Sequence, residues 1–138
     1  MKYLLDTNVV SETRRRVPNE TVIAWFRRAD PSALFLSVLT LGEIAKGAEL
    51  LARRDAQAGT ILNRWLEGLR NNYADRIIGI DAEIAQAWGR MAAARPIPVI
   101  DGLLAATASV QGMTFVTRNE RDAAATGIAV LNPWREGP

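Results

Sequence analysis

Short runs of apolar residues alternate along this chain with longer segments in which apolar residues recur every three or four positions. The short runs are rich in Leu, Ile, Val and Phe and are bounded by polar or turn-forming residues. Such runs are typical of short strands that are buried on both faces. Five strands are predicted, at residues 2–5, 34–38, 77–80, 114–117 and 128–131.

The longer segments predict amphipathic helices between these strands. Thr40-Leu41-Gly42-Glu43 has the pattern of a capping box, so a long helix is expected to begin there. Asp81 can cap a later helix, and Gly112 marks the end of the last one. The predicted helices follow Asp6 and cover about residues 22–30, 40–54, 57–72, 82–94 and 101–111.

Strands that alternate with helices favour right-handed crossovers, and therefore a mostly parallel sheet with helices on both faces. The predicted fold is an α/β protein, a three-layer α/β/α sandwich around a mostly parallel central sheet. The chain has 138 residues, which is the size of one such domain, so residues 1–138 are expected to form a single domain.

The composition removes several classes of chemistry, because the chain has no cysteine and no histidine. Disulfides, thiolate catalysis, Ser-His pairs and His-Glu-x-x-His metallopeptidase sites are all excluded. Acid–base and metal chemistry therefore depend on carboxylates. No apolar run reaches the roughly 18–20 residues of a membrane-spanning helix, and no leader segment is evident. The prediction is a cytoplasmic protein that does not contact a membrane.

Four carboxylates stand just after predicted strands or at the starts of predicted helices: Asp6, Glu43, Asp101 and Asp122. In a parallel sheet, the carboxyl ends of the strands and the starts of the following helices gather along one edge. We therefore expect these side chains to lie near one another. Carboxylates without imidazole favour Mg²⁺ or Mn²⁺ over Zn²⁺ as the bound metal.

Each of these acids also has a purely structural explanation, because Asp and Glu are common at helix caps. Glu43 can complete the capping box, Asp101 can be an N-cap, Asp6 can form an Asx turn and Asp122 can favour a helix start. Asp6 and Asp101 nevertheless follow hydrophobic runs directly. An unpaired charge is costly in such a place, so something is expected to compensate it.

Four segments of the chain resemble the successive motifs of PIN-domain proteins, and of VapC-type toxins in particular. They occur in the family's order and together span nearly the whole chain. The segments are Leu5-Asp6-Thr7-Asn8-Val9, Thr40-Leu41-Gly42-Glu43-Ile44-Ala45-Lys46-Gly47, Pro98-Val99-Ile100-Asp101-Gly102-Leu103-Leu104-Ala105-Ala106-Thr107-Ala108 and Val116-Thr117-Arg118-Asn119.

The resemblance implies an endoribonuclease that depends on Mg²⁺ or Mn²⁺, leaves 5′-phosphate and 3′-hydroxyl ends, and is restrained by a small VapB-like antitoxin. Asp6, Glu43 and Asp101 match the family's three acidic positions. The fourth position is either Asp122 or Asn119, because the aromatic residue that often follows the family's last Asp is replaced here by Ala123. We expect Asp6, Asp101 and Asp122 to bind the metal and Glu43 to orient or deprotonate a water.

Other polar residues near these motifs have two possible roles. Asn8 and Thr117 can fix the carboxylates by hydrogen bonds, or they can serve only local turn and strand bonding. Arg14, Arg15, Arg16 and Arg118 can bind RNA phosphates, or they can be solvated surface charges. The bias toward arginine over lysine fits a nucleic-acid partner and equally fits the codon usage of a GC-rich genome.

Apolar helix faces at residues 22–26 and 44–69 are candidate surfaces for the antitoxin and for a second copy of the chain, or they pack within the molecule. A homodimer is the expected assembly, with DNA contacted only through the antitoxin. Two other functions compete with that of a ribonuclease. A haloacid-dehalogenase-like phosphatase would use Asp6 as nucleophile, but it needs an aspartate where Asn8 stands. A non-catalytic PIN-like scaffold could regulate transcription together with a DNA-binding antitoxin.

Overall fold

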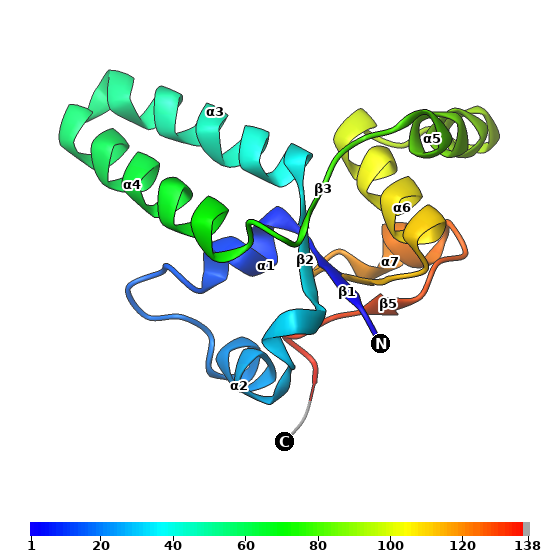
Figure 1. Ribbon diagram of the computed structural model, residues 1–138, viewed down its shortest axis with the longest axis horizontal. Coiled ribbons are helices and arrows are strands. Elements are labelled where there is room, and N and C mark those ends of the chain that lie inside the picture. The colour runs from blue at the N-terminus through cyan, green and yellow to red at the C-terminus, as the bar shows by residue number, and fades with distance from the viewer. Residues whose placement is uncertain (137–138) are drawn as a thin grey trace.

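The computed structural model describes residues 1–136 and contains a five-stranded parallel sheet (Figure 1). The strand order across the sheet is β3-β2-β1-β4-β5, so the chain starts in the middle strand and builds outward on both sides. The fold prediction of a parallel α/β/α sandwich is confirmed. The strands are β1 (Tyr3–Leu5), β2 (Leu34–Ser37), β3 (Ile77–Ile78), β4 (Thr114–Val116) and β5 (Val130–Leu131).

Helices cover both faces of this sheet. Most of their bounds lie within two residues of the predicted ones, as do most strand ends. The helices are α1 (Thr7–Glu12), α2 (Glu20–Arg28), the short 3-10 helix η1 (Pro31–Ala33), α3 (Val38–Arg54), α4 (Ala56–Asn72), α5 (Ala82–Ala94), α6 (Val99–Gln111) and α7 (Glu120–Ala124).

Alternation of side chains along the strands divides the core into two layers, because successive residues of a strand point to opposite faces. Leu5 and Val116 belong to one cluster, which includes Trp25 from α2 and Ile44 from α3. Leu4 and Phe115 belong to the other, together with Leu104 and Ala108 from α6 and Ala123 from α7. The central strands β1 and β4 therefore have one apolar face toward α2–α4 and the other toward α6 and α7.

Two predicted helix starts were wrong. Helix α3 is capped by the side chain of Ser37, which accepts a hydrogen bond from the backbone N–H of Leu39, so Thr40 and Glu43 do not form a capping box. Helix α6 begins at Val99, with Pro98 before it, and Asp101 lies within its first turn. Both acids are therefore free of the capping role. Asp81 and Gly112 cap their helices as predicted.

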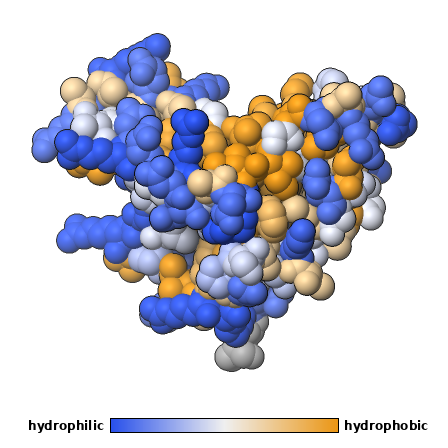
Figure 2. All heavy atoms as spheres, in the orientation of Figure 1, coloured by the Kyte–Doolittle hydropathy of each residue, from blue (hydrophilic) through white to orange (hydrophobic). Residues whose placement is uncertain are grey.

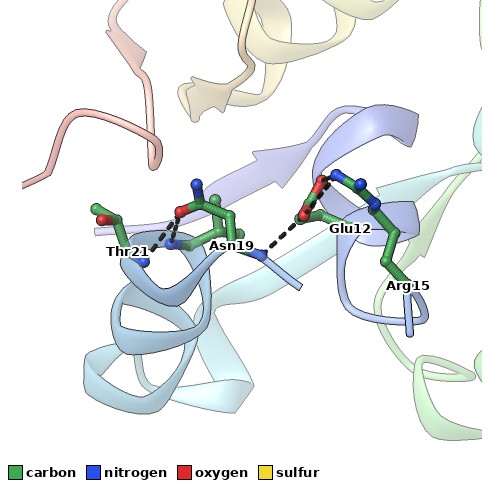
Figure 3. A network of polar contacts seen from close by, with 5 residues as sticks. Glu12, Arg15, Asn19 and Thr21 are labelled. Atoms are coloured by element: carbon green, nitrogen blue, oxygen red, sulfur yellow. Dashed lines mark hydrogen bonds and ion pairs between the residues drawn. The ribbon is translucent and has the colours of Figure 1, made fainter. Parts of the chain in front are cut away.

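A buried carboxylate outside the predicted site organises the basic segment between α1 and α2 (Figure 3). The side chain of Glu12 is 5% exposed, accepts a hydrogen bond of 2.9 Å from the backbone N–H of Asn19, and pairs with Arg15 at 3.3 Å. The Asn19 side chain in turn caps α2. Glu12 therefore closes the turn that carries the arginines.

Helices α3 and α4 form an antiparallel pair that extends away from the sheet (Figure 1). They are in close contact at Gly59, where an added Cβ would lie 2.5 Å from the Cβ of Ala52 and 2.8 Å from its Cα. The helices predicted at residues 40–54 and 57–72 are thus confirmed, and the contact between them depends on the absence of a side chain at residue 59. In residues 1–136, no helix is both long and apolar enough to cross a membrane.

We expect Gly59→Ala to lower the free energy of unfolding by about 1–3 kcal/mol, because the methyl group would force α3 and α4 apart. Gly68→Ala is the matched control on the same helix, since nothing lies within 4 Å of its added Cβ. The control should raise stability by about 0.5–1 kcal/mol through helix propensity. Urea unfolding of both variants measures the difference; equal effects would contradict the close contact.

Candidate active site

The first pair of site residues follows the carboxyl ends of two adjacent strands, β1 and β4. Asp6 follows β1 and Thr117 follows β4, and the backbone N–H of Asp6 donates to the carbonyl of Val116 at 2.9 Å. The Thr117 hydroxyl, which is buried, donates to Oδ2 of Asp6 at 2.8 Å. The other carboxylate oxygen, Oδ1, accepts from the backbone N–H of Thr7 at 2.8 Å, so Asp6 also caps α1.

One cavity of about 160 Å³ brings together residues that are far apart in the sequence. Asp6 lines it from the end of β1, Asp101 from the first turn of α6, and Asp122 from the first turn of α7. Thr117 and Asn119 line it as well. The predicted meeting of acids at the carboxyl edge of the sheet thus describes three of the four carboxylates.

Asn119 connects Asp122 to the Asp6–Thr117 pair. Its backbone N–H donates to the Thr117 hydroxyl oxygen at 3.1 Å, and its side-chain amide donates to Oδ2 of Asp122 at 2.9 Å. The two candidates for the fourth position are therefore hydrogen-bonded to each other. In this arrangement the carboxylate of Asp122 has an orienting partner, and the remaining amide groups of Asn119 stay available to a ligand.

Glu43 lies beside this cavity on α3 and is held through Thr7. The Thr7 hydroxyl donates to Oε1 of Glu43 and lies 3.2 Å from the hydroxyl of Thr40, which is fully buried. The same residue gives its backbone N–H to Asp6. Thr7 therefore couples the positions of Asp6 and Glu43, which come from different elements.

Burial raises the pKa of the Asp6 carboxyl above its ordinary value of 3.8. The hydrogen bonds from Thr117 and Thr7 oppose this shift, whereas the negative charges of Asp101 and Glu43 raise the pKa further. A partly buried carboxylate beside two other acids is unfavourable unless a positive charge compensates it. This arrangement provides an electrostatic reason for the site to bind a cation.

The residues present fit a hard divalent cation, because they offer carboxylate and amide oxygens and no imidazole or thiolate. Within residues 1–136, no three acidic side chains converge closely enough to form a complete metal site. In this arrangement fewer than three carboxylates would bind a cation directly, and water or substrate oxygens would fill the other positions. Mg²⁺ commonly binds in this manner, since it keeps several of its waters.

A glycine next to Asp101 allows α5 to pack closely against the start of α6. A Cβ added at Gly102 would lie 2.9 Å from Cδ1 of Trp88, a side chain of α5. The first turn of α6, which carries Asp101, is therefore seated directly on the indole ring. The close approach fixes this turn relative to α5.

The remaining predicted site residues do not line the cavity. Asn8 is exposed on α1 and, among the described residues, forms no hydrogen bond to a carboxylate. It follows Thr7, the first residue of α1, so its side chain points about 100° around the helix axis from that of Thr7. Arg14 stacks over the ring of Trp65 at 5.5 Å, and Arg118 stacks over that of Trp134 at 4.9 Å. Arg15 pairs with Glu12, and Arg16 is exposed.

Sequence reasoning missed Thr7, Thr40 and the residues of the α5–α6 connection that line the cavity. The signal for Thr7 was its place directly after Asp6, at the first position of the following helix. The apolar helix faces at residues 22–26 and 44–69 had two possible roles, docking and internal packing. Val22, Trp25, Ile44 and Leu69 pack within the molecule, whereas Leu50 and Ile61 are 47% and 53% exposed. Docking on the second face therefore stays a prediction.

A comparison with known proteins shows the family of this domain. A PIN-domain family model matches residues 3–128, so the chain belongs to the PIN-domain family, and the resemblance noted in the sequence is confirmed. Toxin FitB of Neisseria gonorrhoeae is 33% identical over 139 residues, covering 96% of this chain and 99% of that protein. VapC ribonuclease Y4jK of Sinorhizobium fredii is 31% identical over 137 residues, covering 95% and 96% of the two chains.

Solved structures agree with this assignment. The crystal structure of FitAcB from Neisseria gonorrhoeae superposes with a TM-score of 0.89 at 33% identity, over 97% of this chain and 99% of that one. A structure of FitAB bound to an IR36 DNA fragment superposes with a TM-score of 0.88 at 32% identity, over 99% and 98% of the chains. The chain is thus a PIN-domain protein with toxin and ribonuclease relatives.

We expect Asp6→Asn, with a chelator present, to be more stable than the wild type at pH 7, because an amide caps α1 equally well and carries no charge. The raised pKa means that the folded protein binds more protons than the unfolded chain just above pH 3.8, so wild-type stability falls as pH rises through this region. The advantage of Asp6→Asn should therefore shrink as the pH falls from 7 through the raised pKa toward 3.8, and it should be lost below 3.8. Urea unfolding between pH 3 and 7 tests this; parallel profiles would contradict it.

Proposed function

We propose that this protein is the toxin of a VapBC-type module and hydrolyses RNA as an endoribonuclease that depends on Mg²⁺ or Mn²⁺. One observation carries the proposal: Asp6, Asp101 and Asp122, from three separate elements, line one cavity, and Thr7 holds Glu43 beside it. The ribonuclease and toxin names of its relatives support the same assignment.

The proposed roles follow from the contacts of each acid. Asp6 and Asp101 would hold the cation, since Asp6 is fixed by two hydrogen bonds and feels the charge of Asp101. Asp122, oriented by Asn119, would complete the site. When bound, the cation neutralises phosphate charge and lowers the pKa of a water. Thr117 and Thr7 keep both oxygens of Asp6 in a fixed orientation.

Glu43 is proposed as the general base. Thr7 occupies its Oε1, which leaves Oε2 to accept a proton from the attacking water. In-line attack on the phosphodiester would place the water on the side of Glu43 and the leaving 3′ oxygen on the opposite side. The products would then carry 5′-phosphate and 3′-hydroxyl ends, as the resemblance to VapC-type toxins implies.

RNA phosphates are proposed to bind the arginines around this edge. Arg14 and Arg118 each stack on a tryptophan, which limits their motion while the N–H groups remain able to contact phosphate. Arg16, exposed in the turn that Glu12 organises, is the least restrained of the set. Affinity from such contacts should fall as the salt concentration rises.

The proposed partners are a VapB-like antitoxin, DNA through that antitoxin, and a second copy of the chain. The FitAcB and DNA-bound FitAB structures support the first two. For the homodimer, apolar atoms gather in the hollow between the α3–α4 and α5–α6 pairs (Figure 2). Val38 and Val99, which begin α3 and α6, are 40% and 56% exposed.

We expect purified wild-type protein to cleave single-stranded RNA with Mg²⁺ or Mn²⁺ and to lose this activity in EDTA. Asp101→Asn should lower the cleavage rate by more than the ten- to hundredfold that loss of an outer metal-site partner costs. Asp75→Asn, an exposed acid in the turn between α4 and β3, is the control and should cleave normally. Gel analysis of labelled RNA measures the rates; full activity of Asp101→Asn would contradict the assignment.

We expect light scattering to give the mass of two copies for the wild type and of one copy for Val99→Glu, because a charge at this exposed apolar start of α6 would oppose its burial. Val17→Glu is the control, since Val17 is 78% exposed in the turn between α1 and α2. It should remain a dimer. A wild type with the mass of one copy, or equal behaviour of the two variants, would contradict this interface.

A further inference from the structure

The cavity that contains the three aspartates is also lined by apolar residues that the proposed hydrolysis does not use, and we call these residues its apolar half. They include Phe115 from β4, Ala105 from α6 and Ala123 from α7, all of which are buried. Pro96, Ile97 and Pro98, from the connection between α5 and α6, complete this wall. One cavity therefore joins an acidic region to an apolar one.

Its volume limits what the apolar half can accept. The whole cavity measures about 160 Å³, well below the roughly 300–1,000 Å³ of sites for drug-sized ligands. It suits one flat ring system and not a longer ligand. Three alanines, at residues 105, 123 and 125, leave this space open, since larger side chains there would occupy it.

We propose that the apolar half binds one nucleobase of the RNA substrate, next to the phosphate held at the carboxylates. This inference rests on the proposed function and adds a determinant of the cut sequence. A base has apolar faces and a polar edge, and it is joined covalently to the phosphate that the acidic half would receive. Both halves of the cavity are thus used by adjacent parts of one substrate.

Polar groups at the cavity can read the edge of this base. The Asn119 side chain uses one amide N–H on Asp122, so its carbonyl oxygen and second N–H can bind the base edge. The Thr126 hydroxyl donates to the carbonyl of Ala123 and can still accept. Arg95, exposed at the cavity, is placed to bind the next phosphate along the strand.

Ala125 offers a test that does not disturb the core. It lines the cavity yet is exposed, so Ala125→Leu should fill the base site while the protein still folds. Ala124→Leu is the matched control, because Ala124 is the preceding residue, is also exposed, and does not line the cavity. Urea unfolding of both variants checks that they are folded.

Each protein is given a pool of single-stranded RNA with randomised sequence, with Mn²⁺ present, and the new ends are sequenced. The wild type and Ala124→Leu should share a base preference at one position flanking the cut. Ala125→Leu should lose that preference, and its kcat/KM at the preferred site should fall by about ten- to a hundredfold, the range expected when one stacked base is lost.

The outcomes separate this inference from the function on which it rests. No cleavage by the wild type would contradict both. Cleavage by the wild type, with the same cut pattern in Ala125→Leu as in Ala124→Leu, would overturn the base site and leave the ribonuclease standing. An unchanged cut pattern combined with weaker binding of Ala125→Leu to the antitoxin encoded with it would also overturn the base site, because a protein side chain would then be the occupant.

Discussion

The geometry of the site depends on one interaction, the hydrogen bond between the Thr117 hydroxyl and the carboxylate of Asp6. It joins the carboxyl ends of β1 and β4, two adjacent inner strands, at the point where the sheet ends and the helices begin. The bond is formed by a buried hydroxyl, and it partly offsets the cost of burying a charge there. Because Asp6 also caps α1, the same side chain sets where that helix starts and where Thr7 points.

Hydrogen bonds extend from this contact in two directions. Thr7 links Asp6 to Glu43 on α3, and Asn119 links Thr117 to Asp122 on α7. Asp101 reaches the same cavity from α6, whose first turn is seated on Trp88 through Gly102. The acids repel one another, as the raised pKa of Asp6 reflects. A site of this kind holds like charges together by packing and hydrogen bonds, and is thereby prepared for a cation.

The periodicity of apolar residues was sufficient to predict the sheet, most helix bounds and the clustering of Asp6, Asp101 and Asp122, because these follow from local pattern and from the geometry of parallel sheets. Local patterns misled where they offered two explanations. Thr40-Leu41-Gly42-Glu43 matched a capping box, yet Ser37 caps α3 and leaves Thr40 and Glu43 to Thr7. The apolar face of residues 22–26 fitted either docking or internal packing, and the structure places Val22 and Trp25 in the core.

The sequence by itself determined the order of elements, the exclusion of histidine and cysteine chemistry, and the family to which the chain belongs, since each of these is local or compositional. The tertiary structure alone decided which neighbours each acid has. The Thr117–Asp6 bond joins residues 111 positions apart, and the Thr7–Glu43 bond joins residues 36 positions apart. The first contact follows from the pairing of β1 with β4, and the second from the packing of α1 against α3. Small residues at distant positions, such as Gly59 and Gly102, allow other helices to approach closely.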